Sequence, residues 1–298
     1  MTFEAVMPAA MAVLAEESGI KRASSDPLAC FVLSVLAGAF VAFGAIFATT
    51  VSAGTMMTVV PDGTLVSSAA VPYGISRLLI GLAFCVGILA VIIAGAELFT
   101  GNNLVVMAWA SGKVTTRALL FNWVLVFVGN SIGAIFTAGL MYFTMQYTFG
   151  GGAVGLVALN TATAKASLPL LPAFTLGIMC NALVCLAVWM CFSARTNVDR
   201  VVTAVPPVAA FAAAGFEHCV ANVYFIPMGL FIKAGAPESF WKGVNKTAAD
   251  FPDLTWNNFI CNLVPVTAGN IVGGSLIVAA AYWFVYLRNR PVEANRVI

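Results

Sequence analysis

Residues 95–103 read GAELFTGNN and residues 215–222 read GFEHCVAN, and these two stretches decide the fold. Each one places small and polar residues, among them a glutamate, inside a long apolar segment. A helix that crosses lipid must satisfy its own backbone hydrogen bonds, so such an interruption predicts a membrane helix that is broken near its middle. The stretches match at an offset of 120 positions, which pairs Gly95 with Gly215, Glu97 with Glu217, Gly101 with Ala221 and Asn102 with Asn222.

A second match follows each break. Asn122, the pair Gly129-Asn130 and Gly133 reappear 140 positions later as Asn262, Gly269-Asn270 and Gly273. The additional 20 positions fall in one polar loop, at about residues 234–256, which lengthens only the second half. Each half then holds three membrane spans, and because three is odd the two halves lie upside down relative to each other. Inverted repeats with broken helices are typical of transporters and channels.

Composition supports a membrane protein. Of 298 residues, 61% are hydrophobic and 9% are Asp, Glu, Lys or Arg, against about 25% charged residues in a soluble domain. This excludes soluble, disordered and nucleic-acid-binding classes, since a net charge of +2 provides no basic surface. We expect an all-α membrane protein with six spans, at about residues 28–50, 74–110, 118–147, 171–193, 201–232 and 259–287.

The Lys and Arg residues predict the orientation. Nine of the fourteen lie in the termini and in the loops on the terminal side, so the positive-inside rule places both termini in the cytoplasm. Apolar residues at helical spacing predict an amphipathic helix at residues 5–20. We therefore expect an amphipathic cytoplasmic segment at residues 1–26, a six-span channel domain at residues 27–287 and a cytoplasmic tail at residues 288–298.

Three ionisable side chains fall near the middle of the predicted spans, at the two breaks: Glu97, Glu217 and His218. The glutamates occupy equivalent positions, so we expect a structural role in which each binds backbone N–H groups of the opposite break. Asn102 and Asn222 are good N-cap residues, and we expect the second half of each broken helix to restart near them. The N-termini of two half-helices at the midplane favour a small anion.

His218 is the only histidine, and Leu98 stands at its equivalent position in the first break. With a reference pKa of about 6.5, a histidine can change its protonation state under mild acidification. We therefore expect His218 to hydrogen-bond or protonate a weak-acid anion at the narrowest point of a pathway.

The chain resembles the formate/nitrite transporter family, and its formate-channel branch more closely. The similarity covers nearly the whole chain and is carried by residues 7–11 (MPAAM), 94–100 (AGAELFT), 185–190 (CLAVWM), 215–218 (GFEH) with Ala221-Asn222, and 265–270 (PVTAGN). The resemblance implies an aquaporin-like fold, a homopentamer with one pore in each protomer, an inner-membrane location and no cofactor.

The resemblance also assigns residues to the substrate pathway. His218 matches the family's central histidine and Thr100 the threonine that bonds to it, while Asn181 and Lys165 match residues that attract the anion on the outer side. Further residues match the constriction or face the same path: Phe84, Phe211, Ile88 where a leucine is usual, Phe99 and Asn222. Glu97 replaces an aspartate of some formate channels, residues 101–103 differ from their Thr-Ser type of sequence, and residues 163–167 lack histidines found in some members. Nitrite and hydrosulfide therefore stay open beside formate.

Other functional classes fit less well. A proton-coupled anion symporter is the closest alternative, because inverted repeats and a protonatable midplane group suit it equally. A water or glycerol pore is disfavoured because neither break contains Asn-Pro-Ala. A single histidine forms neither a bis-histidine haem site nor a His-Glu-x-x-His metal site, so we expect no enzyme and no metal. The partners that we expect are small monovalent anions, the lipid bilayer and other copies of the chain.

Overall fold

The computed structural model describes residues 4–56, 58–59, 65–66 and 71–290, and this part of the chain is almost entirely helical. The first half contains α1 (Pro8–Ala23), α2 (Pro27–Met56), β1 (Thr58–Val59), β2 (Leu65–Val66), α3 (Tyr73–Ala94), α4 (Phe99–Asn102), η1 (Asn103–Val105), α5 (Val106–Ala110) and α6 (Thr116–Phe143). The second half contains η2 (Gln146–Thr148), α7 (Ala153–Ala166), α8 (Leu170–Cys191), α9 (Asn197–Ala214), α10 (Cys219–Gly235), α11 (Glu238–Gly243), η3 (Ala248–Asp250), α12 (Trp256–Ile271), η4 (Val272–Ala280) and α13 (Ala281–Tyr286). Most of the predicted tail lies outside the described residues.

The helices form a bundle that is long enough to cross a membrane. Five helical segments among the described residues are sufficiently long and apolar: α2, α3, α6, α8 and the continuous run α12–η4–α13. The sixth span is α9 and α10 together, which meet at an angle of 47°. Both broken helices are present, one between α3 and α4 and one between α9 and α10. The predicted all-α, six-span fold is therefore confirmed, and this is a multi-pass membrane protein.

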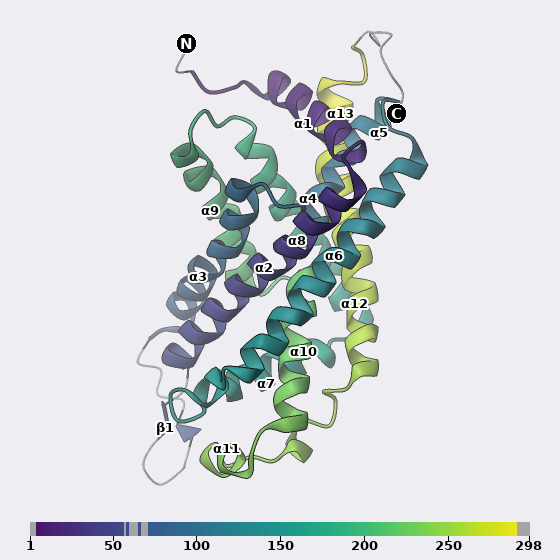
Figure 1. The fold of residues 1–298 in the computed structure, drawn as a ribbon. Coiled ribbons are helices and arrows are strands. Elements are labelled where there is room, and N and C mark those ends of the chain that lie inside the picture. Colours follow the sequence, from purple (N-terminus) through teal and green to yellow (C-terminus); the bar gives the residue numbers. More distant parts are fainter. Residues whose placement is uncertain (1–3, 57, 60–64, 67–70, 291–298) are drawn as a thin grey trace.

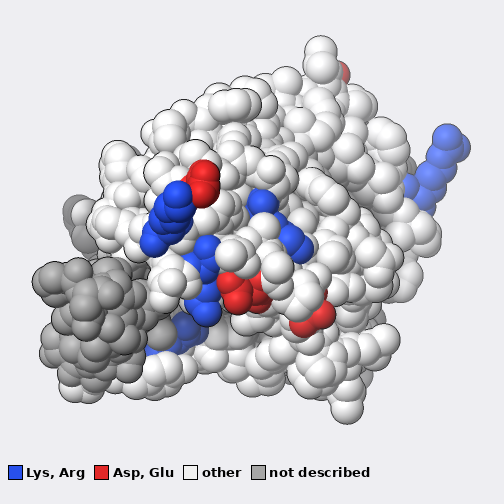
Figure 2. All heavy atoms as spheres, turned by 90° about the horizontal axis from the view of Figure 1, so that it is seen from below, with Lys and Arg blue, Asp and Glu red and all other residues white. Residues whose placement is uncertain are grey.

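Different helices lie at the two ends of the bundle (Figure 1). We call the end with α1 and α13 the terminal end, since the described part of the chain begins and ends there, and the end with α11 and β1 the far end. Figure 2 views the far end, where most of the few charged side chains gather near the middle of the face, acids beside bases. Along the sides, large apolar residues such as Val124, Phe136 and Phe143 are more than half exposed, as expected of a surface that contacts lipid.

Helix crossings in the two halves use matching glycines. A Cβ atom on Gly133 of α6 would overlap the carbonyl oxygen of Val35 on α2, and one on Gly273 would overlap the carbonyl oxygen of Ile178 on α8. Small residues at such crossings let two helix backbones approach closely inside a membrane. The glycines that follow the repeated asparagines therefore determine how the outer spans pack on each half.

We expect Gly133→Ala to destabilise the protein by about 3 kcal/mol, because the methyl group meets backbone that cannot move away easily. Gly139, on the same helix, is a matched control, since its Cβ would meet nothing within 4 Å. Gly139→Ala should be neutral or slightly stabilising because alanine favours the helix by about 1 kcal/mol. Thermal unfolding of the two purified variants in detergent measures both effects, and equal melting temperatures would contradict the packing argument.

Candidate functional site

The first break is held by one asparagine side chain. α3 ends at Ala94, and Gly95 follows with a φ of 78°, a left-handed conformation that favours glycine. Asn130 of α6 reaches the break: its Oδ1 accepts the N–H of Phe99 at 2.9 Å, and its Nδ2 donates to the carbonyls of Glu97 at 2.9 Å and Ser34 at 2.7 Å. Asn130 therefore satisfies backbone groups that the interruption leaves free and ties them to α2.

The second break repeats this arrangement. Gly215 follows α9 with a φ of 77°. Asn270 of α12 accepts the N–H of Cys219 at 2.9 Å and donates to the carbonyls of Glu217 at 2.9 Å and Gly177 at 2.8 Å. The same bonds form at both breaks, so the pairing of the two halves that the sequence predicted is confirmed.

The half-helices restart earlier than the sequence predicted. α4 begins at Phe99 and α10 at Cys219, so Asn102 and Asn222 lie inside the first turn and are not N-caps. That prediction was wrong because another side chain caps α10: Nδ1 of His218 accepts the N–H of Ala221 at 3.1 Å. A nitrogen that accepts a hydrogen bond carries no proton, so this geometry holds His218 as the neutral tautomer with the proton on Nε2.

The two asparagines bind the glutamates instead. Asn102 donates to Glu97 at 2.7 Å and Asn222 donates to Glu217 at 2.6 Å, five residues back in the chain in each case. The expectation that each glutamate binds backbone N–H groups of the opposite break was therefore wrong. Among the described residues both carboxylates contact side chains, because the amides on the adjacent spans, Asn130 and Asn270, already take the free backbone groups.

Each glutamate also faces one basic side chain. Lys165, at the end of α7, forms an ion pair with Glu217 at 2.7 Å. In the first half Arg22, at the end of α1, lies 3.8 Å from Glu97 and donates a hydrogen bond to Asn102. The backbone carbonyls of the two bases are bonded in the same way. Asn122 donates to the carbonyl of Arg22 at 3.2 Å, and Asn262 donates to the carbonyl of Lys165 at 2.8 Å.

Arg22 is a site residue that the sequence analysis missed, since it lies in the segment at residues 1–26 that was expected at the membrane surface. The sequence contains a signal for it: Arg22-Ala23-Ser24 and Lys165-Ala166-Ser167 share a base, an alanine and a serine. Each base also lies five positions before the first residue of the next span, Pro27 in one half and Leu170 in the other. The repeat therefore includes a short helix ahead of the three spans in each half, α1 and α7.

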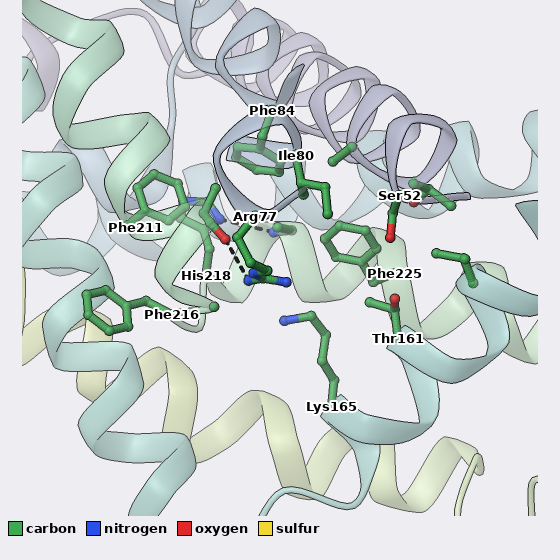
Figure 3. Close-up of a pocket in the computed structure, with 16 residues that line it drawn as sticks. Ser52, Arg77, Ile80, Phe84, Thr161, Lys165, Phe211, Phe216, His218 and Phe225 are labelled. Carbon is green, nitrogen blue, oxygen red and sulfur yellow. Dashed lines mark hydrogen bonds between the residues drawn. The ribbon is translucent and has the colours of Figure 1, made fainter. Parts of the chain in front are cut away.

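Two cavities approach the breaks from opposite ends of the bundle. The Lys165 cavity, of about 120 Å³, is lined by Lys165, Arg77, Phe84, Phe211 and His218 among others (Figure 3). The Arg22 cavity, of about 420 Å³, is lined by Arg22, Glu97, Ile88, Leu98 and Arg200 among others. Each cavity thus combines basic side chains near its mouth with apolar side chains toward the centre.

A short apolar barrier separates the cavities. Phe84 lines one cavity and Ile88 the other, and a spacing of four residues on α3 corresponds to about 6 Å along the helix. Phe84 packs edge-on against Phe211, with ring centroids 5.7 Å apart. At the same level Nε2 of His218 lies 2.9 Å from Oγ1 of Thr100, and both side chains are buried. A polar pair therefore lies beside the apolar barrier.

Three residues assigned to the pathway lie elsewhere. Phe99 packs edge-on against Trp123 and Phe127. Asn181 is fully buried and donates to Asn103 at 2.8 Å and to the carbonyl of Asn270 at 2.7 Å, deep between the breaks. Together with the fully buried Asn222, and like the fully buried Thr100, they are not among the described residues that line either cavity.

This arrangement suits a small anion better than a cation. Cationic groups line both cavities, and the N-terminus of α10, whose N–H groups carry partial positive charge, begins at the barrier next to His218. In this tautomer the Nε2–H of His218 donates to Oγ1 of Thr100. The hydroxyl of Thr100, and the Nε2–H when it exchanges Thr100 for the anion, can donate hydrogen bonds to an anion that leaves its hydration shell at the barrier.

A family model described as formate/nitrite transporter matches residues 9–284. The chain is 42% identical to "Formate channel FocA" of Escherichia coli (strain K12), over 96% of each chain. It is 37% identical to "Formate channel FocA" of Haemophilus influenzae, over 92% of each chain. A solved structure titled "Pentameric formate channel with formate bound" is similar with a TM-score of 0.79 and 42% identity, covering 88% of this chain and 98% of that one.

Proposed function

The chain belongs to the formate/nitrite transporter family, and on that premise we propose that it is a membrane channel, and no enzyme, for small monovalent weak-acid anions, formate first. The observation that carries the proposal is the pair of cavities with basic side chains on either side of the barrier at Phe84 and Ile88, one of them lined by His218, which is bonded to Thr100. Nitrite shares the size and the charge of formate, so the same site admits it.

In this proposal the anion meets three environments in turn. Lys165 or Arg22 attracts it into a cavity, and the aromatic pair of Phe84 and Phe211 removes its water. His218 and Thr100 then replace part of that water with hydrogen bonds. The anion passes as a hydrogen-bonded species, because the proton of the neutral His218 lies on Nε2, next to Thr100. Glu97 and Glu217 bind the amides of Asn102 and Asn222 and orient the two bases.

We further propose that the protein assembles as a homopentamer in the inner membrane with the terminal end in the cytoplasm. The similarity to a pentameric formate channel supports the assembly, and the excess of Lys and Arg on the terminal side supports the orientation. Mass measurement of the detergent-solubilised protein should give five copies, and a protease added outside intact cells should not reach an N-terminal tag.

Purified protein in planar bilayers should conduct formate and nitrite and exclude sodium. The reason is that basic side chains and helix N-termini stabilise an anion at each step, whereas a cation would face them unpaired. Reversal potentials in asymmetric sodium formate solutions measure the selectivity directly. A reversal potential at the sodium equilibrium value would contradict the proposal.

A second measurement separates a channel from a proton-coupled symporter. Vesicles with equal formate on both sides are given a pH gradient, and the formate inside is followed over time. If the protein is an anion channel, the formate concentration stays equal on both sides while the membrane potential is held at zero. Accumulation on the alkaline side would show that a proton moves with each anion.

A further inference from the structure

Arg77 is a second base in the Lys165 cavity, and the sequence analysis gave it no role. It lies in the first turns of α3, near the far end, and reaches across to the end of α9. Its Nε donates to the carbonyl of Ala213 at 2.7 Å and its Nη2 to the carbonyl of Ala212 at 2.9 Å. In Figure 3 its guanidinium and the ammonium of Lys165 point toward each other across the cavity.

The positive charge of this cavity comes from Arg77. The charge of Lys165 is compensated by Glu217, whose carboxylate lies 2.7 Å away. Arg77 forms no ion pair with any carboxylate of the described residues, and its recorded partners are the two neutral carbonyls. Among the described residues that line the cavity, Arg77 is therefore the cation that no carboxylate compensates.

Arg77 also removes a feature that would repel an anion. α9 ends at this cavity, and the last carbonyls of a helix carry partial negative charge. Two of those carbonyls, of Ala212 and Ala213, point at Arg77 and are bonded to it. With the end of α9 neutralised in this way, the N-terminus of α10 contributes the dominant helix dipole at the second break.

The guanidinium keeps donors for a ligand. An arginine has five N–H groups, and the one on Nε and one of the two on Nη2 donate to α9. Both N–H groups on Nη1 and one on Nη2 remain, so each Nη keeps at least one donor. Such a pair matches two oxygen atoms of one planar anion. The ammonium of Lys165, on the other side of the cavity, can donate to the same anion while it remains bonded to Glu217.

We propose that Arg77 and Lys165 form an anion-binding subsite at the far-end mouth of the pathway, for small planar anions with two oxygen acceptors. The subsite rests on the proposed function, since it holds the anion before it reaches His218. The guanidinium of Arg77 supplies a pair of N–H donors and the positive charge that no carboxylate compensates, and the ammonium of Lys165 supplies a donor from the opposite side of the cavity. The site thereby favours carboxylate and nitrite over anions without two oxygens.

Formate flux into proteoliposomes tests the subsite through its concentration dependence. We expect Arg77→Gln to raise the half-saturating formate concentration about tenfold and to change the maximum flux less than twofold, because the barrier at His218 is untouched. Arg77→Lys retains the charge and should shift half-saturation less than about threefold. Unchanged half-saturation in Arg77→Gln would overturn the proposal.

Lys233 is a matched control. Its ammonium also holds two backbone carbonyls, of Phe251 at 2.8 Å and Leu254 at 2.9 Å, and it is not among the described residues that line the Lys165 cavity. Lys233→Gln removes a similarly bonded charge, so its half-saturating concentration should stay within twofold of the wild type. An equal rise in Lys233→Gln and Arg77→Gln would mean that Arg77 acts only through fold or net charge, and would overturn the subsite.

A third measurement does not depend on transport. Crystals of the wild-type protein soaked in sodium nitrite should show a difference-density peak between Arg77 and Lys165 relative to unsoaked crystals, and crystals of Lys233→Gln should keep it. Nitrite peaks only at other places would overturn the subsite even if formate flux is normal. If the wild type bears this peak but passes no formate, the proposed function fails while the anion site stands.

Discussion

His218→Phe is expected to reduce formate flux through reconstituted protein by about a hundredfold. This variant loses a hydrogen-bond donor at the barrier and the cap of α10. The donor at Nε2, which we propose bonds the anion at the barrier, disappears, and a hydrogen bond to a charged group contributes about 1.5–3 kcal/mol. Each 1.36 kcal/mol corresponds to a tenfold change in rate. Initial rates of formate entry into vesicles, at equal protein content, measure the effect.

The same substitution removes the cap of α10, so a second variant is needed to separate the two roles. Asparagine at position 218 is a good N-cap residue and can accept the N–H of Ala221 as His218 does. Its side chain is too short to replace Nε2 beside Thr100. We expect His218→Asn to keep a melting temperature close to that of the wild type and still lose at least about tenfold in flux, as one hydrogen bond predicts. Wild-type flux in His218→Asn would show that the histidine only caps a helix.

The sequence was sufficient to predict the breaks because their causes are local. Gly95 and Gly215 are the residues that can adopt the left-handed conformation ending a half-helix, and an apolar segment with a glutamate inside it has few structures open to it in lipid. The repeat was predictable for a related reason. Asn130 and Asn270 make the same three bonds, so the same residue is needed at both positions.

The exact start of the half-helices and the role of Arg22 depended on tertiary contacts. Asparagine at a break suggests a cap, but here Glu97 and Glu217 compete for the amides and His218 takes the cap of α10. Arg22 reaches the first break only because α1 folds back against η1 and α5. The placement of α1 follows from packing between segments far apart in the chain, which neither hydropathy nor charge reveals.

Asn270→Leu is expected to cause the largest loss of stability of any substitution proposed here. Asn270 is fully buried, and its three bonds serve the N–H of Cys219 and the carbonyls of Glu217 and Gly177. Leucine has a similar volume but no hydrogen-bonding group, so three buried backbone groups lose their partner. At about 1–3 kcal/mol for each unsatisfied group, the loss amounts to roughly 3–6 kcal/mol, since the loop can relax in part.

Comparison with the first half tests the cause of this loss. Asn130 makes the matching bonds, so Asn130→Leu should lower the melting temperature by a similar amount, whereas Asn160→Leu, at an exposed position of α7, should leave it nearly unchanged. Asn270→Asp distinguishes shape from bonding, because its protonated form keeps the acceptor for Cys219 and one of the two donors. It should therefore fall between the wild type and Asn270→Leu in thermal unfolding in detergent. If Asn270→Leu melts like the wild type, water or a shift of the loop satisfies the backbone, and the asparagines do not hold the breaks.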